Sequence, residues 1–195
     1  MFTKSNYLIK EQVAFLKLVD RYDIFDPETG SLVAYAKENI SGLQKALRLV
    51  VKKTFLPTTI EIKSANGDVL QYVMKKKAAF IRSKVVITDA SGNEIGYFRS
   101  RVFTIGGRFD VFKMDDTKIA EVKGKWTGWD FKFLDLSGKE LGSVSKQWSG
   151  IGRELFTNAD NYMIALSPSL QGNAQMMALM LMAGLAIDVV YKEQK

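Results

Sequence analysis

The residues with the clearest binding chemistry are basic and lie close together in the sequence. They are Lys75, Lys77, Arg82, Lys84, Arg99 and Arg101. Alternate residues of a β-strand project from one face, so Lys75 with Lys77, and Arg99 with Arg101, would each present two positive charges together. Such pairs suit phosphate groups, because a guanidinium group can bind two oxygens at once. The pattern predicts a lipid- or phosphate-binding surface, although lysines that protect an edge strand would look the same.

The residue types that most hydrolases and metal sites use are missing. The chain has no histidine and no cysteine, which excludes disulfides, imidazole-assisted or thiolate catalysis, and histidine or cysteine metal sites. Gly150-Ile151-Gly152 lacks the third glycine of a dinucleotide-binding loop. Asp115-Asp116 has the composition of a turn. We therefore expect a protein that is not an enzyme and uses no cofactor.

The length and charge of the chain limit the class of protein further. The 195 residues are 47% hydrophobic, which predicts one folded domain over residues 1–195. The 28 Lys and Arg residues outnumber the 21 Asp and Glu residues, and the net charge of +7 favours anionic partners. Because Met1 to Lys17 contains no long apolar stretch, we expect a cytoplasmic protein, peripheral at the inner membrane face where it meets lipid.

One sequence pattern recurs five times along the chain. It consists of a segment with alternating apolar residues, a turn, and a second segment of the same kind. The paired segments are 22–26 with 32–35, 60–62 with 69–72, 85–88 with 95–98, 109–112 with 119–122, and 131–134 with 141–144. Glycine or aspartate at the turns tolerates positive φ, which is typical of β-hairpins. So many antiparallel strands predict a closed barrel or a sandwich, because an open sheet would expose its edges.

Two segments have helical character. Residues 40–53 place Leu43, Leu47, Val50 and Val51 at helical spacing, which predicts a short amphipathic helix packed across one end of the barrel. Residues 173–191 are apolar on every side from Met176 to Ile187. These twelve residues rise about 18 Å, too short for a hydrocarbon core of about 30 Å, so we expect this helix inside the barrel and not across a membrane.

The region after the fifth hairpin resembles the phospholipid scramblase family. The resemblance lies in residues 144–162, VSKQWSGIGRELFTNADNY, and continues into the apolar helix. Residues 8–16 and 21–24 are similar to the family's opening strand and first hairpin. The resemblance implies a twelve-stranded antiparallel barrel around a central hydrophobic helix, a fold shared with LURP-one-related proteins and the tubby carboxyl-terminal domain. The barrel and its enclosed helix follow independently from the hairpins and the helix length.

The same resemblance implies a calcium-binding segment from Asn158 to Ser169. Its candidate ligands are Asn158, Asp160 and Ser169, and of these only Asp160 has a carboxylate. Calcium prefers six to eight oxygens with several carboxylates, so we expect no strong metal site. For function, the family implies calcium-stimulated movement of phospholipids between leaflets, and tubby-like relatives imply phosphoinositide binding. We expect a monomeric domain that binds phospholipid or an anionic membrane surface. The alternatives are a lipid-transporting scramblase and a protein-interaction domain, and we expect no nucleic-acid partner.

Overall fold

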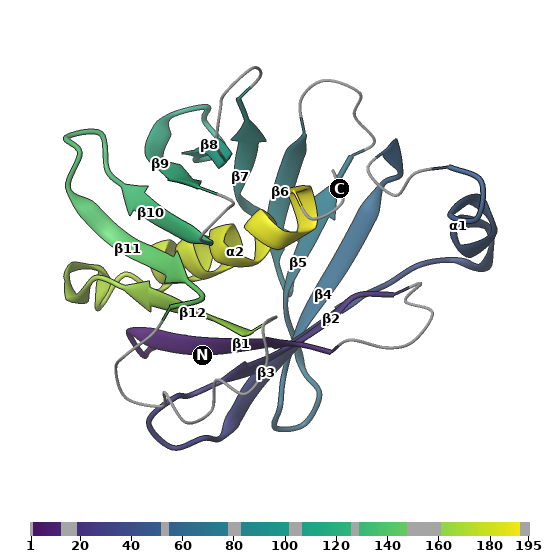
Figure 1. Ribbon diagram of the computed structural model, residues 1–195, viewed down its shortest axis with the longest axis horizontal. Helices are drawn as coiled ribbons and strands as arrows, with labels where there is room; N and C mark the ends of the chain where they lie inside the picture. The colour runs from purple at the N-terminus through teal and green to yellow at the C-terminus, as the bar shows by residue number, and fades with distance from the viewer. Residues whose placement is uncertain are drawn as a thin grey trace.

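Twelve antiparallel strands form a closed barrel in the computed structural model (Figure 1), which describes residues 2–12, 19–51, 55–77, 83–101, 107–125, 129–147 and 161–191. The strands are β1 (Asn6–Glu11), β2 (Arg21–Phe25), β3 (Leu32–Glu38), β4 (Thr58–Ser64), β5 (Leu70–Lys76), β6 (Lys84–Asp89), β7 (Glu94–Ser100), β8 (Gly107–Phe112), β9 (Lys118–Lys125), β10 (Asp130–Leu134), β11 (Glu140–Ser145) and β12 (Asn161–Leu166). Each strand pairs with the next in sequence, and β1 closes the barrel against β12. The predicted barrel is confirmed.

The five predicted hairpins are β2–β3, β4–β5, β6–β7, β8–β9 and β10–β11. Their turns need left-handed backbone conformations, which glycine adopts without a steric penalty. Gly92 has φ of +87° in the third turn, and Asp116, with φ of +62°, holds this conformation in the fourth. All five turns lie at one end of the barrel, which we call the turn end.

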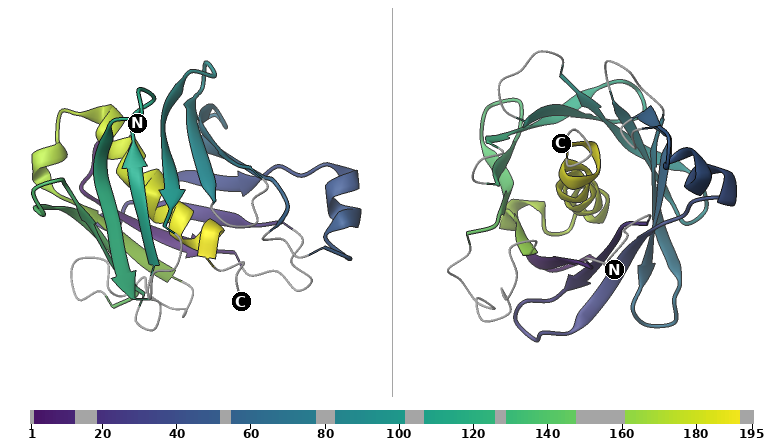
Figure 2. Two further views of the ribbon diagram at one scale, coloured as in Figure 1. Left: turned by 90° about the horizontal axis from the view of Figure 1, so that it is seen from above. Right: turned by 45° about the vertical axis from the view of Figure 1, so that its right-hand side comes forward.

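Helix α2 (Ala174–Tyr191) runs through the interior of the barrel (Figure 2), as the sequence predicts. Every residue from Met177 to Val189 is buried, and the core consists of this helix and the inward-facing strand residues. Gly184 lets the helix approach β12 closely, because a Cβ built there would lie 2.4 Å from Ile164 Cδ1. No helix in the described part of the chain has both the length and the apolarity of a membrane span.

The end of the barrel opposite the turns has a polar inner layer. The buried polar side chains there include Glu11, Glu38, Thr58, Lys76 and Asp188. Burial raises the pKa of the Tyr22 and Tyr162 hydroxyls, and the nearby carboxylate of Asp188 raises both further. Because Asp188 lies in the last turn of α2, this polar layer marks the end of the barrel where the central helix ends.

Helix α1 (Gly42–Leu47) differs from the expectation for residues 40–53. It has six residues and projects from the side of the barrel (Figure 1) instead of packing its apolar face across one end. Leu47 and Val50 are exposed, so the helical spacing of these residues does not mark a buried face. Helix α1 joins β3 to β4 at the end opposite the turns, which we call the α1 end.

Candidate functional site

Of the basic residues singled out in the sequence, those that the structure describes lie on neighbouring strands or directly after them, at the α1 end. Lys84 of β6 and Arg99 of β7 are register partners, and the Lys77 amide donates a hydrogen bond to the Lys84 carbonyl at 3.3 Å. Lys84 and Arg99 alternate with the core residues Val85 and Phe98, and Lys77 follows the buried Lys76, so all three side chains lie on the outer face of the barrel. We call Lys77, Lys84 and Arg99 the basic row. Lys75 lies on the same face, two residues before Lys77, and is exposed.

An aromatic platform supports two members of this row. The Lys84 Nζ lies 3.8 Å from the centroid of the Tyr97 ring, and the Arg99 guanidinium carbon lies 4.7 Å from that of Phe112. The two rings are stacked with their centroids 4.8 Å apart. Cations are attracted to the faces of aromatic rings, so the platform holds Lys84 and Arg99 without neutralising them.

Hydrogen bonds fix the Tyr97 ring in place. Its hydroxyl donates to Asp116 Oδ1 at 2.5 Å and accepts from Arg99 Nη2 at 2.6 Å. Burial, and then the hydrogen bond to Asp116, raise the pKa of this hydroxyl above its ordinary value. The phenol therefore stays neutral and keeps donating its proton to Asp116 at physiological pH.

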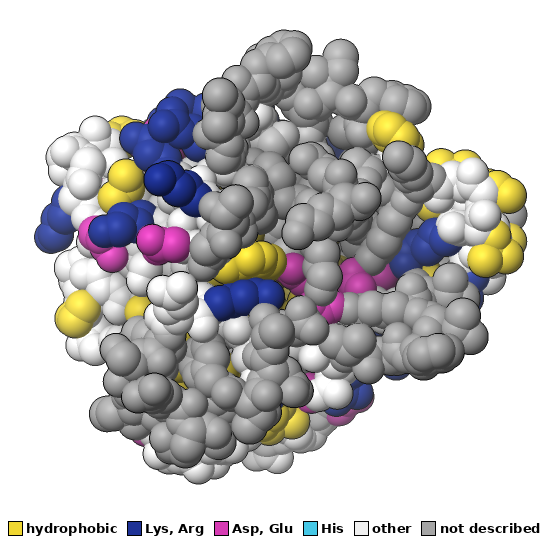
Figure 3. Space-filling view, viewed as in Figure 1, with side chains coloured by type: hydrophobic (Ala, Val, Ile, Leu, Met, Phe, Trp, Pro, Cys, Tyr) yellow, Lys and Arg dark blue, Asp and Glu magenta, His cyan; other side chains and the backbone are white. Residues whose placement is uncertain are grey.

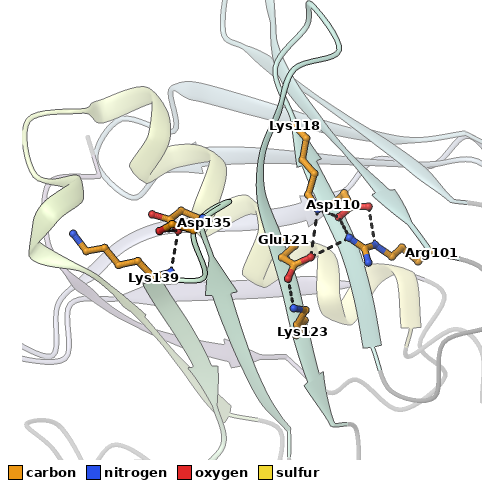
Figure 4. A network of polar contacts seen from close by, with 8 residues as sticks. Arg101, Asp110, Lys118, Glu121, Lys123, Asp135 and Lys139 are labelled. Atoms are coloured by element: carbon orange, nitrogen blue, oxygen red, sulfur yellow. Dashed lines mark hydrogen bonds and ion pairs between the residues drawn. The ribbon is translucent and has the colours of Figure 1, made fainter.

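Arg101 is already bound to acidic neighbours (Figure 4). Its guanidinium donates to both carboxylate oxygens of Asp110, at 2.8 and 2.6 Å, and to Glu121 at 3.0 Å. Lys118 also contacts both carboxylates, and Lys123 pairs with Glu121. Burial opposes ionisation of Asp110, but hydrogen bonds from Arg101 and Lys118 bring its pKa below the ordinary value. Arg101 therefore belongs to an ion-pair network joining β7, β8 and β9.

The contrast between Arg101 and the basic row identifies the cations that are available to a ligand. Among the described residues, no carboxylate forms an ion pair with Lys77, Lys84 or Arg99, or with Lys75. Neighbouring cations on a fixed platform can donate hydrogen bonds to the oxygens of a phosphate group with little loss of side-chain freedom. The sequence identified these cations but not Tyr97 and Phe112. Tyr97 could have been found from the sequence, because it lies two positions before Arg99 and alternate residues of a strand share one face.

Several residues with an expected role lie outside the described part of the chain. They are Arg82, Asn158 and Asp160. Ser169 is described and is exposed in the short helix η3 (Pro168–Leu170), where its amide donates to the Ser167 hydroxyl at 3.3 Å. Within the described residues, no group of three acidic side chains is placed to hold a metal ion. Trp129 packs against Tyr162, with ring centroids 5.1 Å apart.

The charge of the molecule is distributed unevenly along the barrel. The five turns, each with one strand residue on either side, are residues 25–32, 64–70, 89–94, 112–118 and 134–140. They hold nine acidic and three basic residues, a net charge of −6, so the rest of the chain carries +13. The turn end is thus acidic, whereas the backbone positions of the basic row lie toward the other end, with Tyr97 reaching from the row to Asp116 in the fourth turn.

A concavity of about 460 Å³ lies on the outer face of β3 and β4 beside α1. Its charged lining consists of three lysines and three acidic residues, namely Lys37, Lys45, Lys63, Glu38, Glu61 and Asp68. Lys63 is already paired with Glu61, whose pKa is lowered by the hydrogen bond from Asn39 and by Lys63. This cavity therefore lacks the net positive charge that would favour an anion.

The family model described as Scramblase matches residues 20–194. The chain belongs to the scramblase family. This scramblase-family chain is 23% identical over 194 residues to "Altered inheritance rate of mitochondria protein 25" of Saccharomyces cerevisiae, covering 84% of the chain and 59% of the yeast protein.

Two mammalian relatives match a shorter part. Phospholipid scramblase 1 of Mus musculus is 41% identical over 66 residues, which is 33% of this chain and 20% of the mouse protein. The match to phospholipid scramblase 1 of Rattus norvegicus has the same identity and covers 19% of that protein. The chain thus spans less than two thirds of these relatives. No solved structure matches this scramblase-family chain.

Proposed function

We propose that this scramblase-family domain binds the surface of anionic phospholipid membranes through the basic row and Lys75, without enzymatic activity. The observation that carries the proposal is the pair Lys84 and Arg99, which lie side by side on an aromatic platform without a carboxylate partner in the described residues. Phosphate-bearing headgroups supply the negative charge that this pair lacks. Each basic residue near an anionic membrane surface contributes about 1 kcal/mol.

The charge distribution supports one orientation of the domain on a membrane. An anionic surface attracts the end that carries the basic row and repels the acidic turn end. Arg101, which Asp110 and Glu121 already bind, contributes to the potential of this surface more than to direct contacts. Arg82 follows Lys77 in the sequence and adds a further charge to this stretch. We place the protein at the cytoplasmic face of a membrane, as a monomer.

The position of α2 favours binding over lipid transport. A transporter that spans the bilayer with this helix would need to release it from the barrel. Its residues from Met177 to Val189 are buried among the inward-facing strand side chains, and its release would leave those strand side chains open to water at a cost of about 1.5–3 kcal/mol for each large apolar one. We therefore propose that the helix stays enclosed while the outer face of the barrel binds the lipid.

Vesicle co-sedimentation tests the proposal. The protein should sediment with phosphatidylcholine vesicles that contain phosphatidylserine or a phosphoinositide, and not with pure phosphatidylcholine vesicles. High salt should release it, because exposed charges are screened within about 10 Å at 0.1 M ionic strength. Absence of salt-sensitive binding to anionic vesicles, or equal binding to neutral ones, would contradict the proposal.

Two further measurements separate the alternatives. In proteoliposomes with a fluorescent lipid, dithionite should bleach only the outer leaflet, and faster loss of the protected signal would indicate transport. Titration with a DNA duplex at two salt concentrations should show weak binding, whereas tight binding at physiological salt would favour a nucleic-acid partner.

A further inference from the structure

The most exposed apolar side chains of the described residues lie at the tip of α1. Val50 is 81% exposed and Leu49 is 76% exposed, and Leu47 beside them is 37% exposed. Figure 3 shows hydrophobic side chains gathered over α1, where it projects from the barrel. We call Leu47, Leu49 and Val50 the α1 tip. Contiguous exposed apolar residues mark contact sites for proteins or membranes.

The α1 tip is held firmly to the barrel. Arg48 lies between Leu47 and Leu49 in sequence, and its guanidinium pairs with Glu38 at the end of β3, with Nη1 donating to Oε2 at 2.9 Å. Both side chains of this ion pair are almost fully buried. At the other end of α1, the Ser41 hydroxyl accepts from the Gln44 amide, and the Gln44 side chain accepts from the Ser41 amide. These contacts fix both ends of α1 and so hold the tip in its exposed position.

The tip and the basic row lie at the same end of the barrel. The chain leaves α1 and enters β4 at Thr58, which pairs with Lys76, and Lys76 pairs with Val85. Lys77 and Lys84 directly adjoin these two residues. Lys45 on α1 and Lys37 on β3 are exposed but belong to the concavity whose acidic residues balance its lysines, so the positive charge at this end comes from the basic row. An apolar projection is thus combined with cations at one end of the molecule.

This combination identifies the occupant of the tip. A second copy of the chain, placed tip to tip by a two-fold axis, would bring two positively charged ends together and be repelled. A membrane with anionic headgroups above its acyl chains offers negative charge to the cations and an apolar layer to the tip. Basic residues combined with exposed leucine and valine are typical of segments that lie in the membrane interface.

We propose that the α1 tip inserts into the interfacial layer of an anionic phospholipid membrane when the basic row binds its headgroups. This inference rests on the proposed function and specifies how deeply the domain inserts: Leu49 and Val50 enter the boundary between headgroups and acyl chains. The turn end, with its acidic residues, points away from the membrane.

Site-specific labelling tests the insertion directly. The chain contains no cysteine, so Val50→Cys can be labelled with an environment-sensitive dye at one position. The matched control is Leu136→Cys, because Leu136 is 67% exposed in the turn between β10 and β11 at the opposite end. Vesicles containing phosphatidylserine should shift the emission of the Val50 dye to the blue, and a quencher attached to lipid acyl chains should quench it. The Leu136 dye should show neither effect.

The outcomes separate the two proposals. Co-sedimentation with no change at the Val50 dye overturns insertion and leaves surface binding intact, whereas absence of vesicle binding overturns both. Equal changes at both dyes also overturn insertion. A second measurement avoids the dye: Leu49→Ser with Val50→Ser should weaken vesicle affinity about ten-fold, and Leu136→Ser should leave it unchanged. Equal affinity of the double variant and the native chain contradicts insertion.

Discussion

The Lys84 ammonium nitrogen lies 3.8 Å from the centroid of the Tyr97 ring. The ring is buried although it lies on the outer face of the barrel, and the side chains of Lys84 and Arg99 lie over it. This arrangement keeps two neighbouring cations at fixed positions. The proposed binding surface thus includes an aromatic residue that need not touch the lipid.

Substitution of Tyr97 should separate the roles of its ring and its hydroxyl. Tyr97→Phe keeps the ring, so vesicle affinity should stay close to that of the native chain. Tyr97→Leu removes a cation–π contact that contributes about 0.5–1 kcal/mol at exposed sites, and affinity should fall about two- to five-fold. Thermal unfolding of both variants checks that the barrel is intact. An equal loss in the two variants would show that the hydroxyl, and not the ring, is required.

Asp110→Asn should change how stability depends on pH. The pKa of Asp110 is lowered in the folded protein, so its contribution to stability is complete above the ordinary value of 3.8 and is lost as pH falls through the lowered value. The variant should lose less than about 1 kcal/mol at neutral pH, because the network is partly exposed. Its deficit relative to the native chain should shrink toward about pH 2. Chemical denaturation at both pH values measures this difference.

The control for this experiment is Asp68→Asn in the turn between β4 and β5. Asp68 is exposed and is far in sequence from the network of Arg101, Asp110 and Glu121. Its substitution should leave the pH dependence of unfolding unchanged. A deficit of Asp110→Asn that stays constant from neutral to acidic pH would show that the ion pairs do not contribute through the charge of Asp110.

Gly184→Leu should disrupt the packing of α2 against the barrel. Even a Cβ at this position would lie 2.4 Å from Ile164 Cδ1, and the strand side chains leave no room for a larger group. Overpacking of a core typically costs about 1–3 kcal/mol, and the unfolding free energy should fall by at least this amount. Ala174→Leu adds a similar volume at an exposed position at the start of α2 and should be tolerated. Equal stability of the two variants would mean that the helix can leave its position in the barrel.

The strands could be predicted because each hairpin has its own local signal. Alternation of apolar residues and a turn residue with positive φ predict β6–β7 without any distant contact, and the length of residues 173–191 predicts an enclosed helix. Helix α1 could not be predicted in the same way. Leu47 and Val50 have the spacing of a buried face, but helical spacing does not show whether a partner surface is present.

The candidate site was predictable only in part. Alternation along a strand places Arg99 and Arg101 on one face, but their different environments depend on which strands lie beside them. Asp110 and Glu121 come from β8 and β9, and they bind Arg101 and leave Arg99 free to lie over Tyr97 and Phe112. Pairing between strands, and not the sequence of one strand, determines which cation remains available.

The most direct test of membrane binding by the basic row compares two double variants with the same change in net charge. Lys84→Gln with Arg99→Gln removes two charges from the row, and Lys113→Gln with Lys139→Gln removes two exposed charges from the turn end. At about 1 kcal/mol for each charge near the surface, the first variant should bind phosphatidylserine-containing vesicles about thirty-fold more weakly than the native chain. The second should bind as tightly as the native chain or more weakly by less than two-fold, at about the same ionic strength. Equal losses in both variants, or no loss in the first, would contradict the account.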